Sequence, residues 1–216
     1  MRLRSLRGLL LAMLVCTPFA SSWGAVRPEN SSATQPLWAT PVDKSFNLYR
    51  MQPDLYRSAL PSAAQQGELQ QLKIATVINF YQRSDADWLS DASIRQVHQP
   101  LHADRIDDAD VLQALRSIRL AQARGPVLIH CKHGQNRTGM IAAMYRIVYQ
   151  GWSRQQAIDE MREGGFGGRE RFEDAEDYLQ QVDLPRFRAA LDSGACSTSP
   201  WAYCVLKEKV LDAFNG

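Results

Sequence analysis

One segment near the middle of the chain constrains the fold more than any other. Residues 126–130 form a short apolar run, a polar loop follows, and residues 138–150 are apolar on nearly every side. A short apolar run bounded by turn residues is typical of a buried strand, and a helix that is apolar all round lies inside a domain. The segment therefore predicts a strand, a tight loop and a helix at the centre of the protein.

The rest of the chain fits an α/β layer fold. We expect strands at residues 55–60, 74–80 and 97–101, a helix capped by Ser62, and a second helix from Asp107. After the central segment we expect only helices, at residues 153–163, 171–182 and 185–191. Strands that alternate with helices and are then followed by helices alone indicate a central sheet covered by helices.

The first 25 residues have the layout of a secretory signal peptide. Three arginines precede an apolar run at residues 9–20, and small residues follow it. This run is shorter than the roughly 20 residues needed to cross a bilayer, so a permanent transmembrane helix is the weaker alternative. A lipid anchor on Cys16 is a further alternative, disfavoured by the bulky Val15 before it. We therefore predict a periplasmic protein with no permanent membrane span.

The expected leader spans residues 1–25. After it we expect a flexible arm at residues 26–45 and one domain at residues 46–216. The arm is rich in Ser, Pro and polar residues without periodicity. The chain is 45% hydrophobic and 22% charged, which excludes disordered and collagen-like classes. Removal of the leader arginines lowers the formal charge from +2 to −1, so the basic footprint of a nucleic-acid-binding protein is absent.

Three cysteines remain once the leader is removed. Cys196 and Cys204 bracket a Ser-Thr-Ser-Pro turn, so a short disulfide loop is geometrically reasonable in an oxidising compartment. Cys131 is then the free thiol. The alternative is that Cys196 and Cys204 are small buried hydrophobic side chains instead.

The polar loop at residues 131–137 has the features of an anion-binding site. Backbone N–H groups of a loop that leads into a helix point inward, and the positive end of the helix adds to their field. Lys132 and His133 either contact a second anionic group with their side chains or face water. The expected phosphate-binding residues are Lys132, His133, Gly134, Gln135, Asn136 and Arg137.

Cys131 is the expected nucleophile of this site. The field that binds an anion also favours a thiolate over a thiol, so a lowered pKa is expected for Cys131. Arg137 can present two donors to phosphoryl oxygens, and Thr138 can donate to the sulfur when it becomes the leaving group. Two alternatives are an inert cysteine in a surface loop and a zinc site with His133, although no further Cys or His pair lies at ligand spacing. We expect no metal and no cofactor.

The same chemistry needs a general acid, because the leaving oxygen must be protonated as its bond to phosphorus breaks. Asp104, Asp107 and Asp108 are the candidates. Asp107 and Asp108 lie at the expected start of a helix, where acidic residues serve as caps and dipole partners. Asp104 lies in the loop before that helix.

Residues 130–139 resemble the signature of the Cys-based protein tyrosine and dual-specificity phosphatases, which is His-Cys, five residues, then Arg-[Thr/Ser]-Gly. Residues 55–61, 102–108 and 144–148 are similar to the exported bacterial members, so the resemblance covers most of the chain. It implies a four- or five-stranded sheet between helices and a phosphocysteine intermediate. It also implies that Asp104 is the acid on a mobile loop. We expect His130 to support the loop by hydrogen bonding rather than to act as the acid.

The resemblance further implies a protein phosphatase that acts on phosphotyrosine, with phosphoserine and phosphothreonine as additional substrates. For exported bacterial members it implies a membrane-anchored diguanylate cyclase as the target, and hence repression of cyclic-di-GMP signalling and biofilm formation. Two alternatives remain open at this point. One is a phosphatase of inositol phosphates or phosphoinositides with the same mechanism, and the other is a non-catalytic phosphate-binding module.

Overall fold

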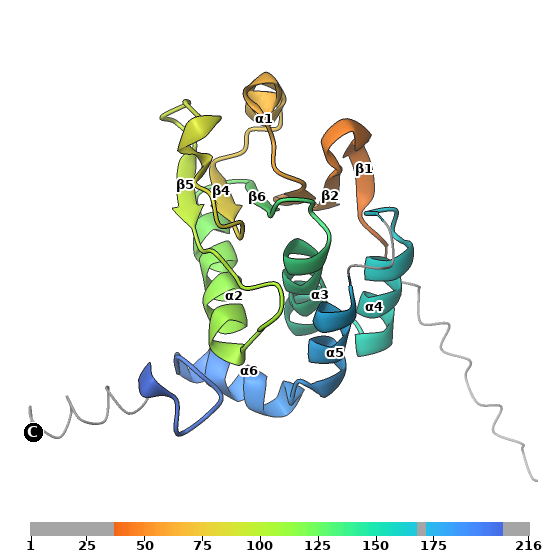
Figure 1. Ribbon diagram of the computed structural model, residues 1–216, viewed down its shortest axis with the longest axis vertical. Coiled ribbons are helices and arrows are strands. Elements are labelled where there is room, and N and C mark those ends of the chain that lie inside the picture. The colour runs from red at the N-terminus through yellow and green to blue at the C-terminus, as the bar shows by residue number, and fades with distance from the viewer. Residues whose placement is uncertain (1–36, 168–171, 205–216) are drawn as a thin grey trace, which may run out of the picture. The chain divides into compact units, whose positions relative to one another are not determined.

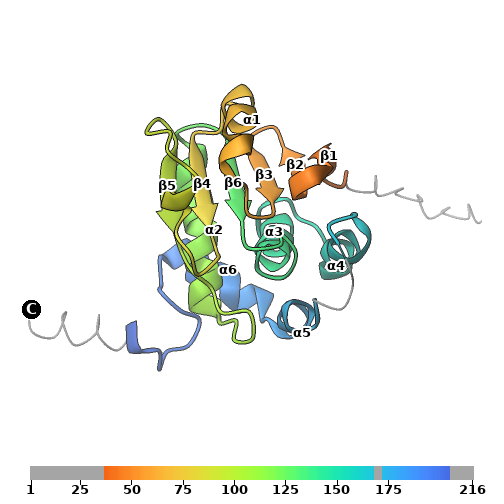
Figure 2. The ribbon, with the colours of Figure 1, turned by 45° about the horizontal axis from the view of Figure 1, so that its top comes forward.

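A mixed sheet of six strands, in the order β1-β2-β3-β6-β4-β5, organises the protein. The structure is a computed structural model that describes residues 37–167 and 172–204. Strands β3, β6, β4 and β5 are parallel, and β1 and β2 add an antiparallel edge (Figure 2). The strands are β1 Thr40–Asp43, β2 Leu48–Gln52, β3 Leu55–Ser58, β4 Thr76–Asn79, β5 Arg95–His98 and β6 Val127–His130.

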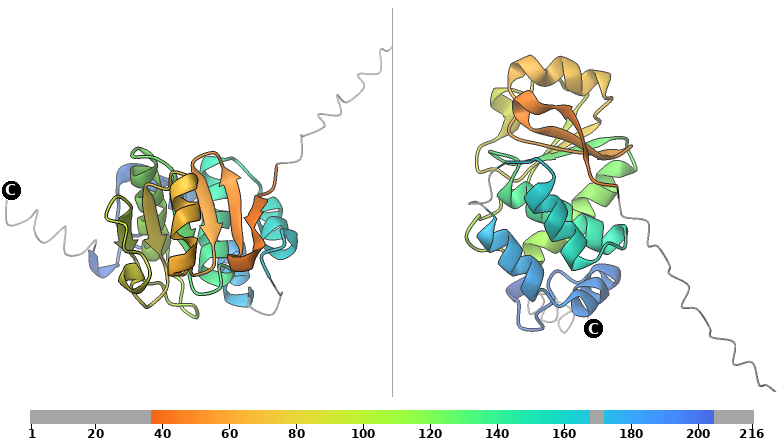
Figure 3. Two further views of the ribbon diagram at one scale, coloured as in Figure 1. Left: turned by 90° about the horizontal axis from the view of Figure 1, so that it is seen from above. Right: turned by 90° about the vertical axis from the view of Figure 1, so that its right-hand side faces the viewer.

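Helices cover both faces of this sheet. Helix α1 lies on one face and α2 to α6 lie on the other (Figure 1; Figure 3 gives two further views). The helices are α1 Gln66–Gln71, α2 Asp108–Gln122, α3 Asn136–Tyr149, α4 Arg154–Glu163, α5 Glu173–Gln181 and α6 Leu184–Ser193. Short 3-10 turns lie at Lys44–Phe46, Ala63–Gln65 and Asp85–Asp87. The expected α/β fold with a central sheet between helices is confirmed.

The alternation of side chains along the central strand explains the two layers. Val127 and Ile129 of β6 pack in the cluster that includes α2 and α3, whereas Leu128 packs on the opposite face with Leu69 of α1. Successive side chains of a strand point to opposite faces, so one short strand supplies both cores. All four residues of β6 are buried, as predicted for the apolar run.

Local sequence sets where the helices begin. Asp107 caps α2 by accepting a hydrogen bond from the N–H of Asp110 at 2.9 Å. Ser153 and Gln156 form a capping box at the start of α4. Helix α3 begins at Asn136, two residues before the apolar run that predicted it.

The N-terminal edge of the sheet departs from the sequence expectation. The predicted arm is wrong for residues 40–43, which form β1 and pair with β2, and the sheet has six strands rather than four or five. Pro41 is compatible with a strand at an edge, where its missing N–H is not needed by a second neighbour. A bulge between Arg50 and Gln52 interrupts the alternation of β2, which hides that strand in the sequence. The predicted leader and the arm up to residue 36 lie outside the described residues.

The strand order determines where a site can lie. β6 is flanked by β3 and β4, both parallel to it, so the loop after β6 leaves the sheet at its middle. Ligands of open α/β sheets bind outside the carboxyl ends of such strands. Within residues 37–167 and 172–204, no helix is long and apolar enough to cross a membrane.

Candidate active site

The loop between β6 and α3, residues 131–137, is called the nucleophile loop below. Gly134 lies at its turn with a φ of +70°. A Cβ atom there would lie 2.5 Å from the carbonyl oxygen of Ser58 in β3, so only glycine fits without a shift of backbone. The loop therefore packs directly on the neighbouring strand.

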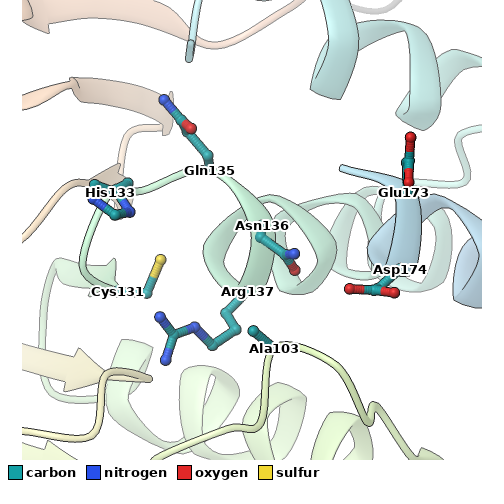
Figure 4. Close-up of a pocket in the computed structure, with 8 residues that line it drawn as sticks. All are labelled: Ala103, Cys131, His133, Gln135, Asn136, Arg137, Glu173 and Asp174. Atoms are coloured by element: carbon teal, nitrogen blue, oxygen red, sulfur yellow. The ribbon is translucent and has the colours of Figure 1, made fainter. Parts of the chain in front are cut away.

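The nucleophile loop forms one wall of a pocket of ≈ 290 Å³. Figure 4 shows the thiol of Cys131 and the guanidinium of Arg137 close together, with two carboxylates of α5 across the pocket. The pocket is lined by Ala103, Cys131, His133, Gln135, Asn136, Arg137, Glu173 and Asp174.

Cys131 sits at the floor of this pocket and is 2% exposed. Burial raises the pKa of its thiol, but the nearby hydroxyl and backbone N–H of Thr138 and the positive charge of Arg137 lower it. The Thr138 hydroxyl is buried and has no hydrogen-bond partner within the described residues, so it is free to donate to a thiolate. The lowering effects prevail, so the pKa of Cys131 lies below its ordinary value. Cys131 is thus a buried thiol whose surroundings favour the nucleophilic thiolate.

The guanidinium of Arg137 has one nitrogen that is hydrogen-bonded to the protein and another that has no partner among the described residues. Its Nη1 donates to the carbonyl oxygens of Phe80 at 3.3 Å and Leu101 at 3.4 Å. Its Nε is buried and has no hydrogen-bond partner among the described residues. A buried donor without a partner is costly, and an anion bound beside Cys131 would satisfy it.

His130 supports the loop from below and does not line the pocket. Its side chain is fully buried, with Nε2 3.0 Å from a carboxylate oxygen of Asp85. The other carboxylate oxygen of Asp85 accepts from Asn79 at 2.9 Å and from the indole of Trp88 at 2.8 Å. His130 is therefore placed in a structural network, where the sequence interpretation put it, and Asp85 is a partner that the sequence did not reveal.

The structure does not bring the predicted acid to the nucleophile. Asp104 is exposed in the loop between β5 and α2, and it lines a neighbouring groove, whereas the adjacent Ala103 lines the pocket of Cys131. Asp107 is the cap of α2, and Asp108 accepts a hydrogen bond from Tyr178 at 2.8 Å. Both are thus engaged structurally, and Asp104 remains the candidate acid, although it lies outside the pocket of Cys131.

The remaining residues of the loop divide into two groups. His133, Gln135 and Asn136 line the pocket, whereas Lys132 is exposed and does not. The sequence interpretation missed Glu173 and Asp174, which reach the pocket from the first turn of α5. Acidic residues at a helix start are common caps and dipole partners, so their pattern gave no separate signal.

The pairing of the cysteines in the structure is the one expected from the sequence. Cys196 and Cys204 are joined by a disulfide, and Cys131 is the free cysteine of the described chain. Among residues 37–167 and 172–204, no group of three or more Cys, His, Asp or Glu side chains could hold a metal ion. The zinc alternative at Cys131 and His133 therefore has no third ligand there.

Taken together, the site can bind a tetrahedral anion and attack it. The nucleophile loop ends at the N-terminus of α3, where unpaired N–H groups and the helix dipole favour negative charge. Cys131 supplies a sulfur anion, and Arg137 supplies a positive charge and an unpartnered Nε donor beside it. This combination suits displacement at phosphorus through a covalent intermediate.

Comparison with known proteins agrees with this chemistry. Residues 55–182 match the family described as "Dual specificity phosphatase, catalytic domain". The dual specificity protein phosphatase TpbA of Pseudomonas aeruginosa strain UCBPP-PA14 is 49% identical over 187 residues, which is 87% of this chain and 86% of TpbA.

Solved structures show the same relationship. A crystal structure of a Cys-to-Ser variant of P. aeruginosa TpbA in complex with phosphotyrosine is 50% identical, with a TM-score of 0.72 over 74% of this chain and 99% of that one. Human DUSP28, at 17% identity and a TM-score of 0.52 over 71% of this chain and 97% of its own, shares the fold. The chain is therefore a member of the dual-specificity phosphatase family of protein phosphatases.

Proposed function

We propose that this protein is an exported phosphatase that hydrolyses phosphotyrosine through a phosphocysteine intermediate. The observation that carries the proposal is the pairing of a buried Cys131, whose pKa is lowered, with the unpartnered Nε of Arg137. One group attacks phosphorus and the other binds the oxygens on which charge accumulates.

In the first step the Cys131 thiolate forms an S–P bond while the bond between phosphorus and the tyrosine oxygen breaks. The electron pair of that bond goes to the phenolate oxygen, which takes a proton from Asp104. Asp104 must enter the pocket for this transfer, and Ala103 beside it already lines the wall. Closure of the loop over bound substrate supplies the movement.

In the second step water attacks phosphorus and the S–P bond breaks, with its electron pair returning to the sulfur. Asp104, now a carboxylate, accepts a proton from the attacking water. The hydroxyl of Thr138 stabilises the departing thiolate by donating to it, in agreement with the lowering of the Cys131 pKa by this residue. Inorganic phosphate and a regenerated thiolate are the products.

The walls of the pocket favour a phosphomonoester over a polyphosphate. Glu173 and Asp174 line the pocket opposite Arg137, so a second phosphate group near them would meet like charge. The TpbA relative with bound phosphotyrosine supports a tyrosyl ester as substrate. Inositol phosphates are therefore the weaker candidate.

Export is supported by two features. The first 25 residues have the layout of a cleavable leader, and Cys196 forms a disulfide with Cys204, a bond that persists in oxidising compartments. We assign the protein to the periplasm on these grounds. Fractionation of cells that carry the full chain tests this, since a cytoplasmic product of uncleaved mass contradicts it.

The resemblance to exported bacterial phosphatases also suggests a physiological role. A relative is named "tyrosine phosphatase related to biofilm formation A". We propose a membrane-anchored diguanylate cyclase as the phosphorylated partner, with dephosphorylation lowering cyclic-di-GMP. Deletion of the gene should then raise cyclic-di-GMP and biofilm mass, and complementation with a Cys131→Ser variant should fail to restore either.

The central experiment compares substrates in one assay. Phosphate release is measured from phosphotyrosine, phosphoserine and phosphothreonine peptides and from inositol hexakisphosphate, with Cys131→Ser as the matched control. We expect turnover of the tyrosyl peptide, none by the variant, and retained phosphate binding by the variant. Faster release from the inositol ester contradicts the substrate class, and undiminished turnover by Cys131→Ser contradicts the nucleophile.

A further inference from the structure

Three successive carbonyl groups of the nucleophile loop are held from outside the loop. The carbonyls belong to Lys132, His133 and Gly134. Their donors are the backbone N–H of Leu60 at 3.3 Å, the side-chain amide of Asn47 at 3.1 Å and Nη2 of Arg57 at 2.8 Å. The N–H and C=O of a planar peptide point in opposite directions, so carbonyls drawn outward turn the N–H groups toward the anion.

Arg57 is the unusual member of this set. It lies in β3, is 1% exposed, and has its guanidinium 3.6 Å from the centre of the Phe166 ring. Its Nε is buried without a hydrogen-bond partner among the described residues. Burial lowers the pKa of Arg57 to about 10, which leaves it charged at neutral pH.

The charge of Arg57 has no carboxylate partner in the described part of the chain, where the ion pairs involve other residues. Glu160 attracts it at longer range, but its oxygens are taken by Arg146 at 2.6 and 2.9 Å and by the N–H of Ala39 at 2.6 Å. An unpaired buried cation is costly, so a compensating anion is expected nearby.

A thiolate at Cys131, in the nucleophile loop, supplies such an anion. Arg57 bonds Gly134 from behind, and Cys131 stabilises its positive charge by electrostatic attraction. Gly139, in the first turn of α3, also lies over the guanidinium, with its Cβ position 3.6 Å from Nη2. The cation therefore lies behind the loop, while Arg137 approaches from the pocket side.

We propose that Arg57 is a positioning residue of the phosphatase: its hydrogen bond to Gly134 fixes the anion-binding shape of the nucleophile loop, and its buried charge stabilises the Cys131 thiolate and the bound phosphoryl group. The inference rests on the proposed function of the same site. It adds a second arginine, from a different strand, to the residues on which the reaction depends.

The test measures the pH at which Cys131 is half-ionised, from the rate of its alkylation by iodoacetamide. Other charged or titratable groups face the sulfur or its loop from every side, and all of them are kept in each variant below. They are His130 with Asp85 beneath the loop, Lys132 and His133 within it, Arg137 of α3, and Glu173 and Asp174 of α5. Asp104 lines the neighbouring groove and is also kept.

Arg57→Met removes both the charge and the hydrogen bond while keeping much of the apolar stem. We expect its alkylation midpoint to rise by about one pH unit, and its alkylation rate below that midpoint to fall about tenfold. Arg57→Lys keeps the charge and loses the planar fork, so its midpoint should stay near that of the unchanged protein. Its affinity for vanadate should fall, because the loop carbonyl is no longer held.

Two control variants separate positioning from general stability. Arg116→Met removes another arginine that bonds backbone carbonyls, those of Ala190 and Ala195, and should lower the melting temperature without moving the midpoint. Asn47→Gly removes the neutral anchor of His133 at a φ of 59°, which glycine adopts readily. It should weaken vanadate binding and leave the midpoint unchanged.

An unchanged midpoint in a folded Arg57→Met variant overturns the electrostatic role. If Arg57→Met does not fold, Arg57→Lys decides, since wild-type vanadate affinity in that variant overturns the positioning role. Failure of the proposed function is distinguishable from both outcomes. In that case the unchanged protein itself would show no Cys131 alkylation below pH 8 and no inhibition by vanadate.

Discussion

At the residue scale, the site depends on a sulfur that is both enclosed and ionisable. Burial alone would make Cys131 an inert thiol, and the donors of Thr138 and the charge of Arg137 reverse that effect. These three residues lie within eight positions of one another, so the sequence motif predicted them together. Arg57 and Asn47 could not be predicted, because 77 and 86 residues separate them from the carbonyls that they hold.

Thr138 gives a prediction at this scale. Thr138→Ala should raise the alkylation midpoint of Cys131 by about one pH unit, because a hydrogen bond to the charged form is lost. The thiolate then forms at higher pH, so the acid limb of kcat/KM moves toward alkaline pH. Alkylation across pH 5 to 9 measures the change. Thr138→Ser keeps the hydroxyl and should retain the original midpoint; a shift equal to that of alanine contradicts the assignment.

At the scale of elements, the loop between β5 and α2 carries the proposed acid. The strand and helix on either side were predicted from periodicity and capping, and Asp107 caps α2 as its position suggested. The position of Asp104 relative to Cys131 could not be predicted, because an exposed loop has no packing pattern in the sequence. It lines the neighbouring groove, and only loop movement brings it to the sulfur.

Asp104→Asn should lower kcat for phosphotyrosine about 10²- to 10³-fold, since asparagine cannot protonate the leaving phenolate. For a substrate with a weakly basic leaving group, such as p-nitrophenyl phosphate, the loss should be smaller. Steady-state kinetics on both esters measure the difference. Asp107→Asn is the matched control, because asparagine also caps a helix and its losses should be small for both esters. Equal losses in Asp104→Asn would point to a different acid.

The disulfide gives a second prediction about an element. Cys196 and Cys204 lie eight positions apart in the sequence, and their disulfide closes a short loop. Thr198 in this loop donates a hydrogen bond to Asp108 of α2. Replacing both cysteines with serine should lower the free energy of unfolding by about 2 to 3 kcal/mol, from loop entropy. The activity should be nearly unchanged, since the loop lines no part of the Cys131 pocket.

Urea unfolding with and without a thiol reductant measures that change. The reductant should destabilise the unchanged protein and leave the double variant as it is. An equal effect on both would show that the disulfide does not contribute to stability in solution.

At the scale of the whole described unit, one carboxylate joins three regions. Glu160 of α4 pairs with Arg146 of α3 and accepts from the N–H of Ala39, the residue before the edge strand β1. The order of the expected strands and helices predicted the α/β class, but it did not predict the edge strands β1 and β2. β1 is held by pairing with β2 and by this buried contact rather than by an apolar pattern of its own.

Glu160→Gln should lower the free energy of unfolding by about 3 kcal/mol, because it leaves the buried charge of Arg146 without a counter-ion. Urea titration measures the loss. Glu176→Gln is the control: its partner Arg162 is 41% exposed, and an exposed ion pair contributes at most about 1 kcal/mol. Comparable losses in the two variants would show that burial of the first pair does not matter.

The depth of Cys131 has one more consequence. Thiol–disulfide exchange requires a sulfur–sulfur bond to approach the thiolate along its own axis. Cys131 is 2% exposed and lies in a pocket of ≈ 290 Å³, so we expect that a folded oxidoreductase does not bring its own cystine that close. Small oxidants such as hydrogen peroxide still fit. Steric exclusion therefore protects the sulfur of Cys131 against protein oxidants and leaves it sensitive to peroxide.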